Sequence, residues 1–525
     1  MTKRIAAIVL FVLIAVAAVT PIRSYDYFWH LAAGRWIVDH HAIPVTDPLA
    51  VASVKTPWIN GEWLYEVALD ATHVSDAATS VLNALLIAAI FSAGFWLAAR
   101  KNDWTIAILA AALAFAGASD RLGVRPSTAA AMLIVIAIGM LSSNVPRVEI
   151  VYAVVTIVWI NIHPSALLAP VIALLFARWL AAGISAVALL VNPYGWHAIR
   201  APIELSSVAS SGEYLNAEWL PSDPKLFPLL YATAAIVALA LIVARDKRAN
   251  VWRYAIFAML LILAIRHVRY QGLYFAALPL LLPPIRMWDG FSTRPRPPSG
   301  RPSGGGRVKN PSHIFAAAAL VPIGWAFAHD THRPGVDDER FPIRAAAALK
   351  ASQLPGNIYN VDQFGGLLEW TFYPAQRVLT DGRNELFRQF IADDARARTD
   401  SRAWHAMIAR YNVALAVDEY QADKIEVVDV ASGERRALPA SLVRYRRRDW
   451  ALIAFDDAAM VFARRAVFPP ERIAALEYRY LVPDDPGIRY ASAEIRAAAK
   501  QEVARARREV GDIRIVKELE TGAEN

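Results

Sequence analysis

The sequence contains no cysteine, so it has neither a disulfide framework nor thiol chemistry. Charge is also scarce, because Asp, Glu, Lys and Arg make up 19% of the residues, against about 25% in an average soluble chain. The deficit lies in the first three-fifths of the chain, where apolar segments recur between short polar breaks. These absences argue against a thiol enzyme or a disulfide-rich scaffold, and they point to a membrane-embedded first part.

The first apolar segment, residues 5–20, follows the basic pair Lys3 and Arg4, as the apolar core of a signal peptide would. No small-x-small cleavage site comes after it, and residues 21–24 lead straight into an aromatic stretch. We therefore expect a retained helix.

Further apolar segments recur as far as residue 328, and each approaches the roughly 20 residues that cross a hydrocarbon layer about 30 Å thick. Hydropathy predicts roughly eleven spans, some of them short. The expected fold is an α-helical membrane protein with a C-terminal soluble α/β domain. The expected spans are residues 5–20, 80–99, 105–118, 127–143, 149–162, 165–181, 184–193, 227–244, 251–265, 270–285 and 314–328.

The net charge of +8 would suit nucleic acid in a soluble chain, but in a membrane protein basic residues more often set the topology. With the N-terminus in the cytoplasm, the cytoplasmic loops collect most of the basic residues, including a flexible basic linker over residues 294–309. An odd number of spans then places the C-terminal domain outside. We expect a multi-pass protein of the bacterial inner membrane with a periplasmic C-terminal domain.

The predicted domains follow from this topology. They are a membrane domain over 1–328 with outer loops at 21–79 and 192–226, a periplasmic α/β domain over 329–470, and a charged helical tail over 471–525.

The first outer loop is rich in aromatic and acidic residues and predicts two amphipathic helices, near 26–39 and 60–73. Asp26 and His30 are four residues apart and share a face of the first helix, and Glu62 lies at the start of the second. A carboxylate just outside the bilayer and walled by aromatics suits a general base, because burial would raise its pKa.

Simpler roles remain open for the same acids. Asp26 could cap the helix that it opens, which is worth about 1 kcal/mol, and Asp47, which precedes a proline, could start a turn. Asp26, His30 and Glu62 could also bind a divalent cation, although no ligand spacing specifies a metal site.

Arginines at outer helix ends oppose the positive-inside pattern and need another explanation. They could snorkel or pair with a carboxylate, or they could bind an anion, since the guanidinium fork matches phosphate. Polar breaks between the apolar segments on the outer side of the membrane indicate a cavity that opens to that side. A transporter would instead place polar groups near the middle of the spans. The residues concerned are Arg121, Arg125, His163, Glu218, Arg266, His267 and Arg269.

The segment after residue 340 alternates helical and strand patterns, which predicts a small α/β domain. It contains no P-loop, dinucleotide fingerprint or nucleophile elbow. Asp362, Asp381 and Arg383 fall at strand ends, where α/β sites often lie, although turn formation explains such residues equally. The expected elements are helices at 341–354, 364–372 and 401–410, and strands at 356–361, 376–380, 413–417, 442–446, 451–455 and 460–464.

The chain resembles bacterial membrane proteins of the GT-C superfamily, glycosyltransferases that use polyprenyl-phosphate sugars. The matching residues are 26–35, 44–48, 62–64, 125–126, 161–163, 192–195, 218–219, 266–269, 362–366 and 381–383. The resemblance implies a catalytic acid in the first outer loop, which Asp26 matches by position. It also implies arginines that hold the lipid phosphate. The sequence departs from the pattern in having no paired Asp-x-Asp or Asp-Glu motif near Asp26.

The predicted function is inverting transfer of a sugar from a polyprenyl-phosphate donor to a glycan, lipid or protein acceptor at the periplasmic face. A non-enzymatic envelope scaffold is the alternative, and a transporter the third. The expected partners include membrane lipids but no nucleic acid. A divalent cation is the one cofactor that the sequence leaves open. The candidate catalytic residues are Asp26, Asp47 and Glu62, and the candidate substrate-binding residues are His30, Arg35, Arg125, His163, Glu218, Arg266, His267 and Arg269.

Overall fold

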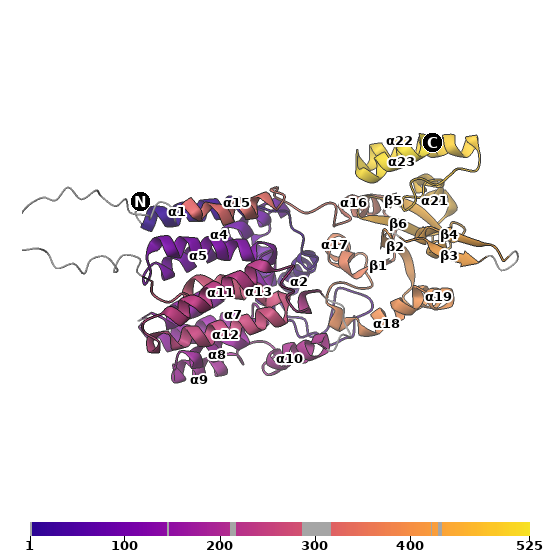
Figure 1. Ribbon diagram of the computed structural model, residues 1–525. Helices are drawn as coiled ribbons and strands as arrows, with labels where there is room; N and C mark the ends of the chain where they lie inside the picture. The colour runs from indigo at the N-terminus through magenta and orange to yellow at the C-terminus, as the bar shows by residue number, and fades with distance from the viewer. Residues whose placement is uncertain are drawn as a thin grey trace, which may run out of the picture. The chain divides into compact units, whose positions relative to one another are not determined.

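The computed structural model describes residues 3–143, 146–210, 217–285, 317–421, 423–428 and 433–524. The chain divides into two compact units, a helical unit of residues 1–22 and 59–335 and a mixed unit of residues 23–58 and 336–525. Their elements are labelled in Figure 1. The division near residue 335 lies close to the predicted one, but residues 23–58 belong with the C-terminal part of the chain rather than with the apolar helices. The predicted basic linker at 294–309 lies outside the described residues.

The helices of the helical unit begin at ordinary start signals. At the start of α4 the Ser75 hydroxyl accepts a hydrogen bond from the backbone N–H of Ala78, and Asp103 does the same for Thr105 at the start of α5. Prolines open α6 and α11. The α-helices are α1 (Lys3–Ala17), α3 (Trp63–Thr72), α4 (Asp76–Ala98), α5 (Trp104–Ala118), α6 (Pro126–Leu141), α7 (Val148–Ile160), α8 (Leu168–Leu175), α9 (Trp179–Ala188), α10 (His197–Ser210), α11 (Pro228–Val243), α12 (Val251–Arg266), α13 (Gln271–Leu281) and α15 (Leu320–Ala328).

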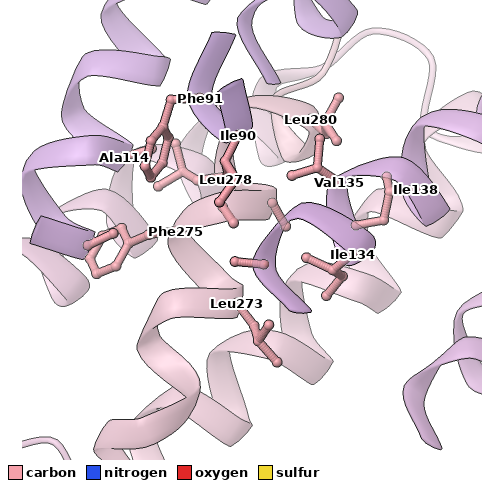
Figure 2. Packing of buried hydrophobic residues seen from close by; sticks show 14 of the residues in the cluster. Ile90, Phe91, Ala114, Ile134, Val135, Ile138, Leu273, Phe275, Leu278 and Leu280 are labelled. Carbon is pink, nitrogen blue, oxygen red and sulfur yellow. The ribbon is translucent and has the colours of Figure 1, made fainter. Parts of the chain in front are cut away.

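Helix α13 forms the centre of this unit, because every one of its residues is buried. It packs against α4, α5, α6 and α12. Figure 2 shows the contact from close by, with Phe275 and Leu278 of α13 among the side chains of Phe91, Ala114 and Ile134. The alanine-rich face of α5 lets neighbouring helices approach closely, as small residues do between membrane helices.

In the part of the chain that the structure describes, two helices are long and apolar enough to cross a membrane, Asp76–Ala98 and Arg248–Arg266. The others are shorter; α8, with 8 residues, is about 12 Å long at 1.5 Å per residue. A helix occurs in each predicted apolar segment, although residues 314–316 of the last lie outside the described ones. The predicted number of roughly eleven crossings is not confirmed.

Several helices of the helical unit expose large apolar side chains. On α1, Ile5, Ile8, Val12 and Val16 form a stripe at helical spacing and are each about half exposed. A contiguous exposed apolar face of this kind marks contact with an apolar medium or partner. Comparable side chains on other helices are Ile150 and Val154 of α7, Trp179 and Leu180 of α9, Ile236, Leu239 and Ile242 of α11, and Val321 of α15.

The mixed unit is a four-stranded sheet with helices around it. The strand order is β1-β2-β6-β5, in which β1 and β2 are parallel and the other pairs antiparallel. The strands are β1 (Asn357–Asn360), β2 (Val413–Glu419), β5 (Trp450–Phe455) and β6 (Ala459–Arg464), with a separate hairpin of β3 (Ile425–Val428) and β4 (Arg435–Leu438). The α-helices are α2 (Tyr27–His40), α16 (Ile343–Ser352), α17 (Asp362–Phe372), α18 (Arg388–Ala397), α19 (Ser401–Arg410), α20 (Ala440–Arg444), α21 (Pro470–Leu476), α22 (Ala493–Val510) and α23 (Arg514–Glu524).

The structure confirms a largely helical chain with a C-terminal domain that contains strands. Two predicted strands are wrong. Residues 376–380 make only an isolated bridge to β1, and the carbonyl groups of Val378 and Leu379 accept hydrogen bonds from Val51 and Ala52, which belong to no strand. Residues 442–446 overlap α20, whose start is held by bonds from Ser441 to the Asp484 carboxylate. The β3–β4 hairpin was not expected from the sequence.

Candidate functional site

Asp26 lies at the start of α2, in the position of an N-cap, yet its side chain does not cap the helix. Instead, Asp26 Oδ1 accepts a hydrogen bond of 3.2 Å from the indole Nε1–H of Trp29, one turn further on. The residue is partly exposed to solvent. The capping role considered for Asp26 is therefore not the one it plays, and its carboxylate is oriented by the indole.

Helix α2 packs against α17 within the mixed unit. The contact depends on the absence of a side chain at Gly366, where a Cβ atom would lie 2.7 Å from the backbone nitrogen of Trp29. Further along α2, the exposed guanidinium of Arg35 lies 3.7 Å from the ring centre of Trp370. His30 is buried and packs against the Trp29 ring at 3.6 Å between centres. Gly366 thus receives the helix that Asp26 precedes, whereas its neighbour Gly365 faces Thr380 and Asp381.

Asp47 lies in a fully buried ion-pair cluster. Arg383 Nη1 donates to Asp47 Oδ1 at 3.0 Å, and Arg383 Nε donates to Asp381 Oδ1 at 2.9 Å. The Ser53 hydroxyl and the Leu49 backbone N–H also donate to Asp47. With both oxygens engaged and no exposed surface, Asp47 holds the loop to the domain, and this environment does not suit a general base.

Glu369 of α17 is the third carboxyl beside Arg383, at 3.6 Å from Nη2. Its side chain is fully buried and, within the described part of the chain, neither oxygen has a hydrogen-bond partner. Burial, together with the neighbouring charges of Asp381 and Asp47, raises the pKa of Glu369 well above its usual value, although Arg383 opposes the shift. The surroundings of Glu369 therefore favour the protonated form of its carboxyl.

Arg383 is the cation on which this cluster depends. Burial disfavours its charge, but Asp381 and Asp47 more than compensate, so that the pKa of Arg383 is raised. Its guanidinium also lies over the rings of Trp58 and Trp29, at 4.4 and 5.3 Å from their centres. Residues 381–383 therefore have a structural role: they join residues 23–58 to the C-terminal part of the same unit.

Glu62 belongs to the helical unit, where it precedes α3 and is partly exposed. Next to it, Asn60 Nδ2 donates to the buried carboxylate of Glu66 at 2.6 Å. The Trp63 indole donates to Asn161 Oδ1 at 2.7 Å, which ties α3 to the end of α7. These bonds give the polar residues at 60–66 and 161 a structural role, because they fix the start of α3 and tie it to the end of α7.

His163 follows α7 and is buried. Its Nδ1 accepts the backbone N–H of Ser165 at 3.1 Å and lies 2.8 Å from the Ser165 hydroxyl. A ring nitrogen that accepts a backbone N–H is unprotonated, so the neutral imidazole carries its proton on Nε2. His163 therefore opens the 3-10 turn η2 (Pro164–Leu167) as its cap.

A basic group surrounds Glu218 in the helical unit. Arg125 forms an ion pair with Glu218, and Arg269 lies 4.4 Å from the ring centre of Trp219. Burial would raise the pKa of Glu218, but Arg125, Arg269 and Arg121 together lower it. His267 Nδ1 lies 2.7 Å from the Trp219 carbonyl oxygen. Arg266, at the end of α12, is exposed.

The predicted site residues thus fall into two sets. His30, Arg35, Asp26 and Asp47 belong to the mixed unit. Glu62 belongs to the helical unit, with the other substrate-binding candidates Arg125, His163, Glu218, Arg266, His267 and Arg269. Among the described residues, no group of three or more His, Asp or Glu side chains is placed to hold a metal ion.

Trp29 and Glu369 were not predicted as site residues, although Trp29 lies within the matching segment 26–35 and Glu369 lies three residues beyond the segment 362–366. A signal was present: an indole three residues after an acid at a helix start can reach back to it. No such signal marks the burial of Glu369, because the Arg383 beside it is held in place by Asp47, from a distant part of the chain.

Comparison with models of known protein families finds no match to this chain, and no curated protein matches it significantly.

Proposed function

We propose that this chain is a multi-pass glycosyltransferase of the GT-C type that transfers a sugar from a polyprenyl-phosphate donor, with inversion, to an acceptor at the periplasmic face. The observation that carries the proposal is the state of Asp26. Asp26 is partly exposed as a residue, and its carboxylate does not cap its helix and is oriented by the Trp29 indole. That combination is what a general base for an acceptor hydroxyl requires.

The membrane part of the proposal comprises roughly eleven spans, a cytoplasmic N-terminus and a periplasmic mixed unit. The exposed apolar stripes of α1 and α11 support it, since lipid is the medium that such faces require. The basic residues gathered in the loops assigned to the cytoplasm support the orientation.

In the proposed reaction, Asp26 takes the proton of the acceptor hydroxyl as its oxygen attacks the anomeric carbon. The bond from that carbon to the phosphate oxygen breaks, and the electron pair leaves with the polyprenyl phosphate. Because phosphate is a good leaving group, positioning and charge stabilisation supply most of the acceleration. Arginine is proposed to stabilise the departing phosphate, as the resemblance implies.

The test is Asp26→Asn in the full chain, reconstituted in nanodiscs and supplied with a set of polyprenyl-phosphate sugars. Release of free polyprenyl phosphate is measured, and we expect a loss of about 10²–10⁴-fold, the usual contribution of a general base. Asp39→Asn is the matched control, because Asp39 is an exposed acid of the same helix. Wild-type rates in Asp26→Asn would remove this mechanism.

One observation favours the alternative of a non-enzymatic envelope scaffold. Arg125, a candidate phosphate ligand, is already paired with the protein's own Glu218. The scaffold predicts that Asp26→Asn has no effect on envelope function. Truncation after Ala328 is a poor test, since it would also leave α2 without α17. Density for polyprenyl phosphate beside Arg125, Arg266 and Arg269 in nanodiscs would count against the scaffold.

A further inference from the structure

Arg253, in the first turn of α12, is a buried arginine without an acidic partner among the described residues. It is 5% exposed, and in the described part of the chain Arg383 is the one other buried arginine. Three acids surround Arg383, whereas the polar and aromatic contacts of Arg253 are two hydrogen bonds and one ring. A buried charge is normally paired, because its removal from water is costly. The described residues therefore supply no counter-charge to Arg253.

Two hydrogen bonds hold the guanidinium of Arg253 in place. Nε donates to the carbonyl oxygen of Leu280, in the last turn of α13, at 3.3 Å, and Nη1 donates to Asn250 Oδ1 at 2.8 Å. The guanidinium also lies over the ring of Trp252, at 4.2 Å from its centre. An arginine has five N–H donors. These two bonds use two of them, and the described residues offer no acceptor to the rest.

Asn250 ties the loop before α12 to Arg253. Its side chain is buried, and its Nδ2 donates to the carbonyl oxygen of Asp246 at 2.6 Å while its Oδ1 accepts from Arg253. Asp246 itself is exposed, and its Oδ1 accepts the backbone N–H of Ala249 at 2.9 Å. The acid of this loop therefore caps a turn of the loop and does not pair with Arg253.

Lys247 of the same loop brings a second cation to this region. Its Nζ donates to the carbonyl oxygen of Leu241, in the last turn of α11, at 3.1 Å, and the hydroxyl of Tyr254 donates to the same oxygen. The ammonium group therefore lies beside the residue that follows Arg253. A guanidinium with spare donors and a lysine nearby suit a phosphate group, which accepts several charge-assisted hydrogen bonds.

Apolar side chains around this region favour a lipid as the source of the phosphate. Ile242 and Val243, at the end of α11, are largely exposed, and so is Val251, at the start of α12. Exposed apolar side chains beside a basic site suit the acyl chains of a lipid whose headgroup occupies that site. A free phosphate ion would make no use of them.

We propose that the start of α12 is a phosphate-binding site, in which Arg253 holds the phosphate group of an anionic lipid and Lys247 adds a second positive charge. The site lies at the opposite end of α12 from Arg266, about 20 Å away at 1.5 Å per residue. In the proposed topology it meets the cytoplasmic leaflet, where basic sites between helices bind anionic headgroups. The lipid source rests on the proposed membrane embedding, whereas the phosphate site does not depend on sugar transfer.

The site can be tested without the transfer reaction. The full chain, delipidated in a neutral detergent, is titrated with dioleoylphosphatidylglycerol, and native mass spectrometry measures the bound lipid. We expect saturable binding whose affinity falls by about tenfold or more in Arg253→Gln, because a hydrogen bond to a charged group is lost. The glutamine amide can still donate to the Leu280 carbonyl, so the tie to α13 can persist.

Arg248→Gln is the matched control, because Arg248 is an exposed cation of the same loop. It should leave the affinity within about twofold, since exposed charges are screened. Equal losses in Arg253→Gln and Arg248→Gln would mean binding by surface charge alone and would overturn the site. Hydrogen exchange across α12 and α13 without lipid checks the fold of each variant. If Arg253→Gln loses protection there, Lys247→Gln takes its place, and an effect no larger than that of Arg248→Gln overturns the site.

Inorganic phosphate, titrated by calorimetry into the wild type and Arg253→Gln, separates the two sources. We expect the lipid to bind more tightly than phosphate alone, because its acyl chains also contact the exposed apolar side chains. Phosphate that binds in an Arg253-dependent way while the lipid does not would overturn the lipid source and keep the site. A wild type that binds neither overturns the site itself. Loss of sugar transfer with lipid binding intact would count against the proposed function alone.

Discussion

The two units of this chain distribute polar and apolar side chains in opposite ways. The helical unit exposes isoleucine, leucine, tryptophan and phenylalanine, whereas the large apolar side chains exposed in the described part of the mixed unit are all valines. The mixed unit instead buries charge, with Arg383 and three acids in its interior. The contrast indicates that the helical unit is stabilised against an apolar medium and the mixed unit against water.

The contrast also shows where each unit is vulnerable. Burying apolar helices against one another gains little in lipid, so small residues and close packing hold them together. A buried ion cluster is costly to form and costly to break, because one missing partner leaves an uncompensated charge. A substitution that removes one buried charge should therefore destabilise the mixed unit most. A substitution that adds a charge to an exposed apolar face should most reduce the membrane insertion of the helical unit.

The largest effect is expected from Arg383→Met, which leaves Asp47 and Asp381 unpaired in the interior. The mixed unit should lose about 3–5 kcal/mol of unfolding free energy. Hydrogen exchange at β2, measured on the full chain in nanodiscs, reports that loss. Arg435→Met is the control, because Arg435 pairs with Glu426 on the surface and such pairs contribute about 0–1 kcal/mol. Equal protection in the two variants would contradict a stabilising cluster.

A charge placed on the exposed apolar face of α11 tests the other half of the comparison. Leu239→Arg should cost about 2.5–3.5 kcal/mol of insertion free energy if this face meets lipid. Extraction of the protein from membranes by alkaline carbonate measures the inserted fraction. Val428→Arg, at an exposed valine of β3, should leave it unchanged. An unchanged inserted fraction for Leu239→Arg would argue against lipid contact at α11.

The pH dependence of stability sharpens the comparison further. Glu369 has a pKa that is higher in the folded than in the unfolded state, so the folded state binds the extra proton. Stability is therefore complete below the unfolded value of about 4.5 and falls as pH rises towards the folded value, by up to about 1.4 kcal/mol per pH unit. Glu369→Gln should remove this fall. Denaturant titrations of the mixed unit from pH 4 to 8 should then give a flatter slope for the variant, and parallel slopes would contradict a protonated Glu369.

The smallest effect is expected in the polar ties of the helical unit. Trp63→Phe removes the indole donor to Asn161 and should cost about 1 kcal/mol. Hydrogen exchange across α3 measures it, with Trp36→Phe in the mixed unit as the control. Unchanged exchange in α3 would show that Trp63 contributes only by packing.

The local pattern of the sequence predicted much of this fold. Helices 26–39 and 401–410 and the strands at 413–417, 451–455 and 460–464 are close to their observed positions. Their side chains repeat with the period of the element, so the signal lies within the segment itself. The strands predicted at 376–380 and 442–446 were wrong, because partners from distant parts of the chain decide these segments. Val51 and Ala52 bond the first segment, and Asp484 holds the start of the helix that overlaps the second.

The candidate site was predictable only in part. Asp26 stands out from its place at the start of an aromatic helix. The burial of Asp47 could not be seen, because its partner Arg383 is 336 residues away, and the same holds for Glu369. Gly366 in α17 and Gly382 in the turn of residues 381–383 each mark a point where residues 26–29 approach a distant segment, and one sequence does not show which segments meet there.

The mixed unit is made from two pieces of chain, residues 23–58 and 336–525, and this has a consequence for its biogenesis. During synthesis α2 emerges long before α17, at a pace of roughly 5–20 residues per second. Phe28 and Leu31, both buried in the finished protein, must then wait some tens of seconds for their partners. The first piece therefore needs a chaperone or the membrane surface to shield it, and the unit completes its sheet only after the last helix of the other unit has been translated.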